Sequence, residues 1–280
     1  MKHLIRITDY SKEDISNIYK IADEIQEGSF ENALNRKTIV LFFPNTSIRT
    51  RVTFEKGIHL FGGQVILFPS DSLDKKEKME DVVGYLNNWV DCIIVRHSDI
   101  DLINEIAKYS KVPVINAMTS INHPCEVLSD LYSLSKLRKD YLSLNYTFIG
   151  ANENIGKAWL EASKLLGFNL KQSCPKGYEL DNISIEYDIS KAMKNSDIIL
   201  TDSISNVKNE FKDYHITKEL MERANKGALI NPCPPFTRGE EVSSCVIDSE
   251  YFVGYGFKKS LLYVQQAIIL YNIYDSLLIK

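Results

Sequence analysis

Short runs of β-branched and apolar residues alternate along the chain with longer stretches in which apolar residues recur every three or four positions. The runs lie at residues 38–43, 65–68, 92–95 and 112–115, and again at 146–149, 169–172, 197–200 and 228–230. Short strands separated by helices of ten or more residues are typical of parallel sheets. The pattern predicts an α/β fold with two domains, each a parallel sheet flanked by helices, joined near residues 135–144.

Helical patterns occupy both ends of the chain. Ser11 precedes a periodic segment and Asp14 follows three positions later, which is the arrangement of a capping box. The segment at 261–278 is apolar on most sides, so we expect this C-terminal helix to pack back across the domains. The expected organisation is a first domain at residues 1–135, a second at 136–260, and a C-terminal helix at 261–280 that returns to the first domain.

Composition and charge narrow the class of partners. The 280 residues are 44% hydrophobic and 25% charged with a net charge of -4, so no overall basic field favours nucleic acid or an anionic membrane. The first residues lack the order of a signal peptide, and no apolar run approaches about 18 residues. Five widely spaced cysteines without a C-x-x-C pair argue against disulfides and zinc. We expect a cytoplasmic protein with reduced thiols and no bound metal.

The segment after the first strand carries candidate anion ligands. Residues 44–51 read Pro-Asn-Thr-Ser-Ile-Arg-Thr-Arg and open a helix. The expected apolar face of this helix includes Val52, Phe54, Ile58 and Phe61. A helix start presents unpaired N–H groups and the positive end of the dipole, and hydroxyls and guanidiniums add donors. Ser47 is expected to cap the helix. From the residues alone, a phosphate site and an ordinary capped surface helix remain equally open.

These residues are similar to a known family pattern. Ser47-x-Arg49-Thr50-Arg51, followed by Phe54-Glu55, resembles the S-T-R-T-R-x-S-F-E signature with which aspartate and ornithine carbamoyltransferases bind the phosphate of carbamoyl phosphate. Further segments continue the resemblance in order: 91–97, His123-Pro124-Cys125-Glu126 with Asp130, 150–154 with Trp159, 175–179, Thr201-Asp202, and 233–242. Those at 150–154 and 175–179 resemble the ornithine branch. The resemblance spans nearly the whole chain and implies a carbamoyltransferase that needs no cofactor.

The resemblance implies a role for each residue of the donor site. Carbamoyl transfer requires donors on every oxygen that gains negative charge. The expected carbamoyl-phosphate ligands are Ser47, Ile48 (through its backbone N–H), Arg49, Thr50, Lys75, Arg96, His123 and Glu126. Arg96 and His123 would polarise the carbonyl oxygen and, with Cys233, form the catalytic set. A histidine standing alone is more often structural.

Lys75 lies in a polar loop of mixed charge at residues 70–81. In the family that loop carries a lysine across a subunit interface into the neighbouring site, and the spacing to Glu77 and Asp81 selects Lys75 over Lys76. The resemblance therefore implies a homotrimer with shared active sites. A simply solvated loop is the alternative.

For the amino-acid substrate, the resemblance implies binding by Asn154 and Asp202, with Asn206 and Val207 in the recognition loop and Cys233 near the reacting amine. Asparagine and aspartate also favour turns and caps, and Cys233 has an alternative reading as a buried inert thiol.

The chain departs from the family pattern at several of these positions. Glu126 replaces a glutamine and adds a charge that weakens phosphate binding unless a cation compensates. Leu261 stands where an arginine is expected, with Lys258 and Lys259 as the nearest basic residues. A histidine is missing before Cys233, and a Ser-Met-Gly loop reads Asn-Val-Lys at 206–208. The acceptor is therefore expected to be an ornithine-like amino acid or a related specialised amine.

Three other functions remain open from the sequence. A related transferase could use an acyl or amidino phosphate, because Glu126 offers an acceptor for an extra donor. A catalytically silent relative could bind a metabolite or a partner subunit. An NAD-binding protein is disfavoured, because Gly150 is followed by Ala151 and Asn152 and no G-x-G-x-x-G motif is present.

Overall fold

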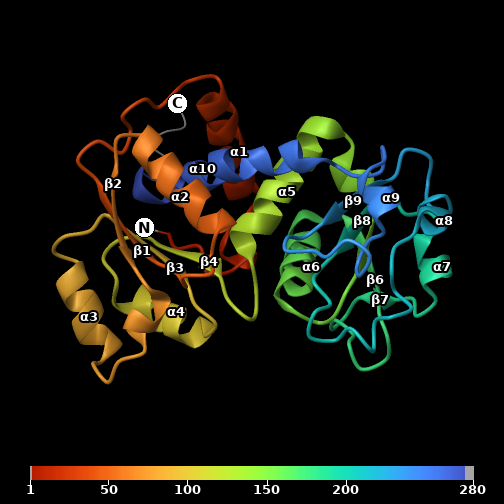
Figure 1. Cartoon of the computed structure of the whole chain (residues 1–280). Helices are drawn as coiled ribbons and strands as arrows, with labels where there is room; N and C mark the ends of the chain where they lie inside the picture. The colour runs from red at the N-terminus through yellow and green to blue at the C-terminus, as the bar shows by residue number, and fades with distance from the viewer. Residues whose placement is uncertain (1, 275–280) are drawn as a thin grey trace. The chain divides into compact units, whose positions relative to one another are not determined.

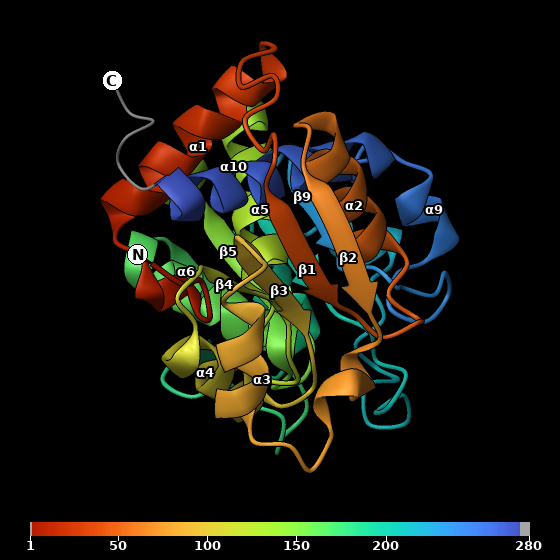
Figure 2. The ribbon, with the colours of Figure 1, turned by 90° about the vertical axis from the view of Figure 1, so that its left-hand side faces the viewer.

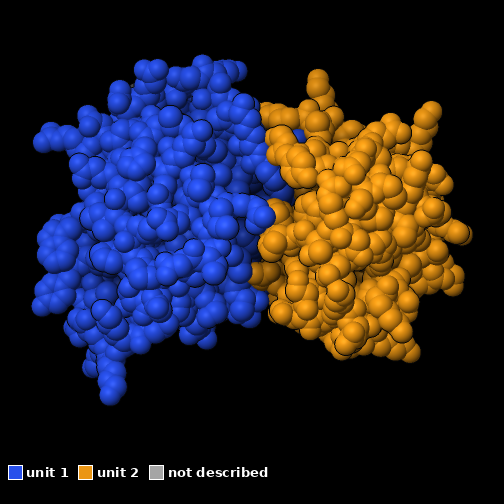
Figure 3. Space-filling model, viewed as in Figure 1, with its two compact units in different colours: residues 1–133, 258–280 blue, residues 134–257 orange. Residues whose placement is uncertain are grey.

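The computed structural model describes residues 2–274 and divides into two compact units (Figure 3). Unit 1 comprises Met1–Ser133 and Lys258–Lys280, and unit 2 comprises Leu134–Phe257. The division falls inside helix α5 (Pro124–Leu137). Residues 275–280 of the expected C-terminal helix lie outside the described residues.

Unit 1 contains a four-stranded parallel sheet in the order β2-β1-β3-β4. The strands are β1 (Thr38–Phe42), β2 (Gln64–Phe68), β3 (Cys92–Arg96) and β4 (Val114–Met118). β1 and β3 are buried along nearly their whole length, because helices cover both faces of the sheet. The expected strands of the first domain are confirmed within three residues at each end.

Helices cover both faces of this sheet (Figures 1 and 2). One face carries α3 (Met79–Leu86) and α4 (Ile100–Tyr109), whose apolar side chains share a core with β1 and β3. The opposite face carries α1 (Lys12–Gln26), α2 (Arg49–Leu60) and α10 (Ser260–Tyr274). Short 3-10 helices lie at η1 (Ile7–Asp9), η2 (Ser70–Leu73) and η4 (Tyr255–Lys259).

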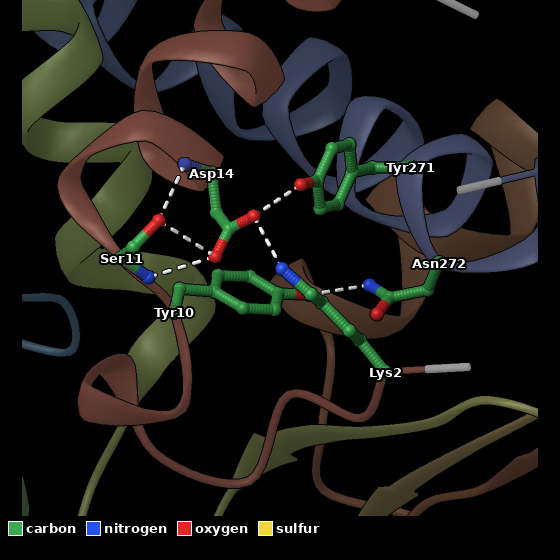
Figure 4. Close-up of polar contacts among 6 residues, drawn as sticks. All are labelled: Lys2, Tyr10, Ser11, Asp14, Tyr271 and Asn272. Atoms are coloured by element: carbon green, nitrogen blue, oxygen red, sulfur yellow. Dashed lines mark hydrogen bonds and ion pairs between the residues drawn. The ribbon is translucent and has the colours of Figure 1, made fainter. Parts of the chain in front are cut away.

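Helix α10 packs against α1 and α2 and is buried on nearly every side. Figure 4 shows the polar contacts that attach its end to the N-terminal segment. Tyr271 donates to the Asp14 carboxylate, which also accepts from Lys2 Nζ at 2.5 Å and from the Ser11 backbone N–H. Asn272 donates to the Tyr10 hydroxyl. The capping box predicted at Ser11 and Asp14 is confirmed, and Asp14 additionally joins the two ends of the chain.

Unit 2 contains a five-stranded parallel sheet in the order β7-β6-β5-β8-β9. The strands are β5 (Asn145–Ile149), β6 (Asn169–Ser173), β7 (Ser184–Ile185), β8 (Ile198–Thr201) and β9 (Leu229–Pro232). The helices are α6 (Asn154–Leu166), α7 (Ile189–Met193), α8 (Lys218–Met221) and α9 (Ser244–Ile247), with the 3-10 helix η3 (Tyr141–Ser143). The two-residue strand β7 was not predicted, because it is too short to produce a period. The α/β class with two parallel sheets is confirmed.

Three local expectations are wrong. Val52 is 57% exposed, so the buried face of α2 consists of Phe54 and Ile58, with Phe61 just after the helix end. The loop predicted at 70–81 is partly helical, because η2 and the first turn of α3 lie within it. Ser47 does not cap α2: the helix begins one residue later, Ile48 occupies the N-cap position, and no side chain caps it.

The five cysteines are all free, and four of them are buried. None of the helices described over residues 2–274 is long and apolar enough to cross a membrane.

Candidate active site

The sheet of unit 1 changes winding direction between β1 and β3. β1 pairs with β2 on one side and β3 on the other, so the connections leaving their carboxyl ends run to opposite faces of the sheet. Such a switch point leaves a crevice where α/β proteins bind ligands. The segment with Ser47 and Thr50 leaves β1 at this point, and Arg96 is the last residue of β3.

Arg96 connects the two sides of this crevice. Its Nη1 donates to Ser47 Oγ and to Thr50 Oγ1, each at 3.1 Å. Both hydroxyl residues are buried at the start of α2. The Ser47 hydroxyl therefore accepts from Arg96 instead of capping the helix. A guanidinium beside two hydroxyls and a helix N-terminus forms a donor-rich position suited to an oxyanion.

Three other expected phosphate ligands lie at the surface of unit 1. Ile48 is 72% exposed, so its side chain leaves the crevice and its backbone N–H is the group available to a ligand. Arg49 is the first residue of α2 and is exposed. Lys75 is exposed in the segment between η2 and α3.

The segment with Lys75 is attached to the end of β3. His97 Nδ1 accepts from the Asp99 backbone N–H, so its Nε2 carries the proton in the neutral ring and donates to Asp74 Oδ1 at 3.0 Å. Asp74 directly precedes Lys75, and His97 directly follows Arg96. The sequence reasoning missed this contact, because a histidine and an aspartate 23 positions apart in exposed segments give no periodic signal.

His123 is buried just before α5, and its Nδ1 has no hydrogen-bond partner within residues 2–274. Burial lowers its pKa to about 4, and the positive charges of Arg96 and Lys258 act in the same direction while Glu126 opposes them. The imidazole is therefore neutral near pH 7. A neutral ring can donate a hydrogen bond to a carbonyl oxygen without bringing a further charge into the site.

Glu126 is buried in the first turn of α5 and is paired with a cation from the C-terminal part of unit 1. Lys258 Nζ lies 2.6 Å from Glu126 Oε1 and 2.6 and 2.8 Å from the two oxygens of Asp130. Burial alone would raise the pKa of Glu126, but the positive charges of Lys258 and Arg96 and the Lys258 hydrogen bond hold it below its ordinary value. Glu126 is thus ionised near neutral pH, and the compensating cation that this substitution requires is Lys258.

Lys258 is the residue of this site that the sequence reasoning left out of the ligand set. Leu261, at the position where an arginine was expected, is 4% exposed and belongs to the packed face of α10. Lys258 lies three residues earlier, in η4, which places its side chain over α5. The sequence did contain a signal for this pairing: relative to the family pattern, the chain loses an arginine at Leu261 and gains an acid at Glu126.

Unit 2 has its own switch point between β5 and β8. Asn154 begins α6 just after β5, and Asp202 directly follows β8. Asp202 Oδ1 accepts from the Ser203 backbone N–H at 2.8 Å. Desolvation is the main cause that raises the pKa of Asp202 to about 7; the hydrogen bond from the Ser203 N–H opposes this rise, and the nearby carboxylates of Glu153 and Glu241 add to it. A cationic group brought beside Asp202 would restore its charge.

The loop after Asp202 is held by a buried carboxylate. Glu241 accepts from the Ile204 backbone N–H at 3.0 Å through Oε1 and from the Thr237 backbone N–H at 2.7 Å through Oε2. Val207 is half-buried against an apolar cluster that includes Ile204, whereas Asn206 is exposed. The loop that carries the expected recognition residues is therefore fixed by backbone hydrogen bonds at its start.

Cys233 follows β9, the neighbour of β8, and is buried. Its backbone N–H donates to the Thr201 carbonyl at 3.0 Å, which continues the β8–β9 ladder by one residue. This pairing places Cys233 at the same carboxyl edge of the sheet as Asp202.

Comparison with known proteins agrees with this arrangement. The family model described as "Aspartate/ornithine carbamoyltransferase, carbamoyl-P binding domain" matches residues 2–136, and the "Asp/Orn binding domain" model matches residues 143–272. The chain belongs to the aspartate/ornithine carbamoyltransferase family, and it is a carbamoyltransferase, as the sequence resemblance predicted.

The similar proteins come from the ornithine carbamoyltransferase branch. A relative of that name from Ralstonia nicotianae is 32% identical over 97% of this chain and 96% of its own length. The ornithine carbamoyltransferase structure from Burkholderia thailandensis superposes with a TM-score of 0.91 at 30% identity, covering 98% of this chain and 99% of that one. The corresponding structure from Pyrococcus furiosus gives a TM-score of 0.92 at 26% identity, covering 98% and 97%.

Proposed function

We propose that this enzyme transfers the carbamoyl group of carbamoyl phosphate to the amine of an ornithine-like amino acid or a related specialised amine. The observation that carries the proposal is the Arg96 guanidinium, which bonds to both Ser47 and Thr50 at the N-terminus of α2. A phosphorylated carbonyl donor needs positive charge and N–H groups on its phosphate and its carbonyl oxygen. In this proposal Ser47, Arg49, Thr50 and the Ile48 N–H bind the phosphate.

Arg96 and His123 would stabilise the carbonyl oxygen as the tetrahedral state forms. Neutral His123 suits this role, because its unpaired Nδ1 shows that the buried ring has unused hydrogen-bonding capacity. The donors that bind the phosphate of the substrate would also stabilise the negative charge that the phosphate gains as it departs. Removing one such donor typically raises the barrier by about 3 kcal/mol.

The acceptor would be held by unit 2. Asp202 is a carboxylate in a desolvated position beside Glu153 and Glu241, which favours a substrate ammonium. We propose that Asn154 binds the amino-acid head group and that Asn206 and Val207 contribute to side-chain selection. Cys233 would lie near the reacting amine and help hold its departing proton.

The ion pair at Glu126 favours a neutral transferred group over a cationic amidino group. An uncompensated buried carboxylate would attract a cation, but Glu126 already has Lys258 as its counter-ion. Glu126 is then suited to accept a hydrogen bond from a carbamoyl NH2.

We also propose that the working unit is a homotrimer. Apolar side chains are exposed on α2 and on the edge strand β2, where Ile48, Val52, Ile66 and Phe68 are each at least 40% exposed. An apolar sheet edge is normally covered by another chain. The segment with Lys75 follows β2 directly, so a neighbour seated on this edge would receive Lys75. Because the cysteines are free, we propose a reducing, cytoplasmic location.

The test is incubation with carbamoyl phosphate and a panel of amines that includes ornithine, shorter and longer diamino acids, N-acylated ornithines and aspartate. Mass spectrometry should find a ureido product from at least one diamino acid, with stoichiometric phosphate release. Stabilisation by carbamoyl phosphate without any ureido product would instead favour the catalytically silent relative, because binding alone raises the melting temperature.

A further inference from the structure

Glu126 and Asp130 form an unusual pair on α5. They lie four residues apart on the same face of the helix, both side chains are buried, and like charges at this spacing repel. Two buried carboxylates require a shared cation or a proton. Lys258 supplies the cation and bonds to both.

We propose that Lys258 is a positioning residue that makes Glu126 a ligand for the carbamoyl NH2, and that the two together select the donor. This inference rests on the proposed function. Lys258 occupies Oε1 of Glu126, so the carboxylate is fixed in rotation and Oε2 serves as the acceptor for the transferred group. Three residues before Glu126, the buried Nδ1 of His123 has no hydrogen-bond partner among residues 2–274, so a second polar group of this segment is able to bind a ligand.

The groups that act on the charge of Glu126 include Lys258, His123 and Arg96, and Asp130 shares Lys258 with it. Arg96 lies at the end of β3, His123 precedes α5, Asp130 lies on α5, and Lys258 comes from η4. Because His123 is neutral, the two cations Arg96 and Lys258 balance the two anions Glu126 and Asp130. Removal of Lys258 alone leaves a net negative charge beside the phosphate position, whereas removal of the Lys258 and Glu126 charges together restores the balance.

The test compares Lys258→Met, Lys258→Arg, Glu126→Gln and the double variant Glu126→Gln/Lys258→Met. Lys259→Met is the matched control, because Lys259 is the adjacent lysine and is exposed. Binding of carbamoyl phosphate and of inorganic phosphate, which lacks the NH2, is measured by calorimetry between about pH 6 and pH 8. Melting temperatures report on folding, and ureido product formation is followed separately.

Lys258→Met should weaken carbamoyl phosphate binding by roughly 10- to 100-fold at about pH 8. The loss should shrink toward about pH 6, because Glu126 without its counter-ion takes up a proton more readily. Glu126→Gln should restore most of the binding in the Lys258→Met background, and Lys258→Arg should bind nearly as the wild type does. The effect should be larger for carbamoyl phosphate than for inorganic phosphate.

A purely structural role for Lys258 predicts a different pattern. Lys258→Met would then lower the melting temperature, its loss of carbamoyl phosphate binding would not depend on pH, and Glu126→Gln would not restore that binding. This pattern overturns the proposal. Equal binding by the Lys258→Met and Lys259→Met proteins overturns it as well. If Lys258→Met does not fold, the double variant and Lys258→Arg give the same comparison. A wild type that binds carbamoyl phosphate but forms no ureido product refutes the proposed transfer and leaves the binding test intact. A wild type that does not bind it refutes both.

Discussion

The charged atoms of Lys258 and Glu126, Nζ and Oε1, are 2.6 Å apart although the residues are separated by 132 positions in the chain. Two departures from the family pattern, an added acid on α5 and a missing arginine near the start of α10, are thereby connected by one interaction. A buried charge is tolerated only with its partner. Loss of the charge at one of the two positions is therefore expected to be tolerated only when the charge at the other position is lost as well.

Arg96→Ala should lower kcat by about 10²- to 10³-fold, because it removes a donor at the proposed oxyanion position. Steady-state kinetics with saturating carbamoyl phosphate measures the effect. Arg138→Ala is the control, since Arg138 forms an ion pair with the exposed Asp140 in unit 2. An Arg96→Ala enzyme with full kcat would exclude Arg96 from the reaction.

Shared sites predict complementation between two inactive variants. In Lys75→Ala the neighbour's contribution is lost, and in Arg96→Ala the site's own arginine is lost. We assume that each site combines Arg96 of one subunit with Lys75 of the next. Random mixing of equal amounts of the two variant subunits should then restore about a quarter of the wild-type activity. Half of the sites keep Arg96, and half of these receive an intact Lys75 from the neighbour. Activity that stays at the level of the separate variants after subunit exchange would show that each chain owns its site.

Acceptor binding should strengthen as the pH rises through about 7, the pKa to which burial raises Asp202. Below this pH the carboxyl is protonated and neutral, and above it the carboxylate attracts the substrate ammonium. Calorimetry with ornithine, without donor, measures the affinity from about pH 6 to pH 8. In Asp202→Asn the affinity should be low and nearly constant over this range. An equally steep pH dependence in that variant would assign the titration to another group.

Gly57 on α2 lies directly against Gln266 of α10, where an added Cβ would stand 2.0 Å from Nε2. Gly57→Ala should therefore destabilise the protein by about 1–3 kcal/mol, as overpacking does. Gln266→Ala should offset much of this loss in the double variant. Gly84→Ala in α3, where the added methyl meets open space, should instead be neutral or stabilising by roughly 0.5–1 kcal/mol. Urea denaturation of the four proteins provides the comparison.

Asp14 should contribute stability that depends on pH. Burial alone would raise its pKa, but hydrogen bonds from Lys2, Tyr271 and Ser11 lower it well below the ordinary value. The stabilisation is thus present above the unfolded pKa of about 4 and is lost as the pH falls toward the lowered folded value. Asp14→Asn should cost about 2 kcal/mol at neutral pH, and its gap to the wild type in melting temperature should narrow in acid. Glu24→Gln, on the exposed side of α1, should show no such convergence.

The sequence by itself determined the elements and their order. The runs at 38–43 and 92–95 are β1 and β3 within one or two residues, because a strand buried on both faces must be apolar throughout. The capping box at Ser11 was also predictable from the sequence, because it involves residues only three positions apart. The motif residues Ser47, Thr50 and Arg96 follow strand ends, so a parallel sheet brings them to one edge.

Only the tertiary structure decided what each polar side chain contacts. Serine is a residue type that commonly caps helix N-termini, yet the Ser47 hydroxyl accepts a hydrogen bond from Arg96, 49 positions away. Lys258 was one of two adjacent lysines, and the position of η4 beside α5 selected it as the partner of Glu126. Hydrophobic period and capping are read from neighbours within a few residues, whereas these contacts join segments that the folded core brings together. The sequence carries the chemistry of each group, and the packing of the helices decides which groups meet.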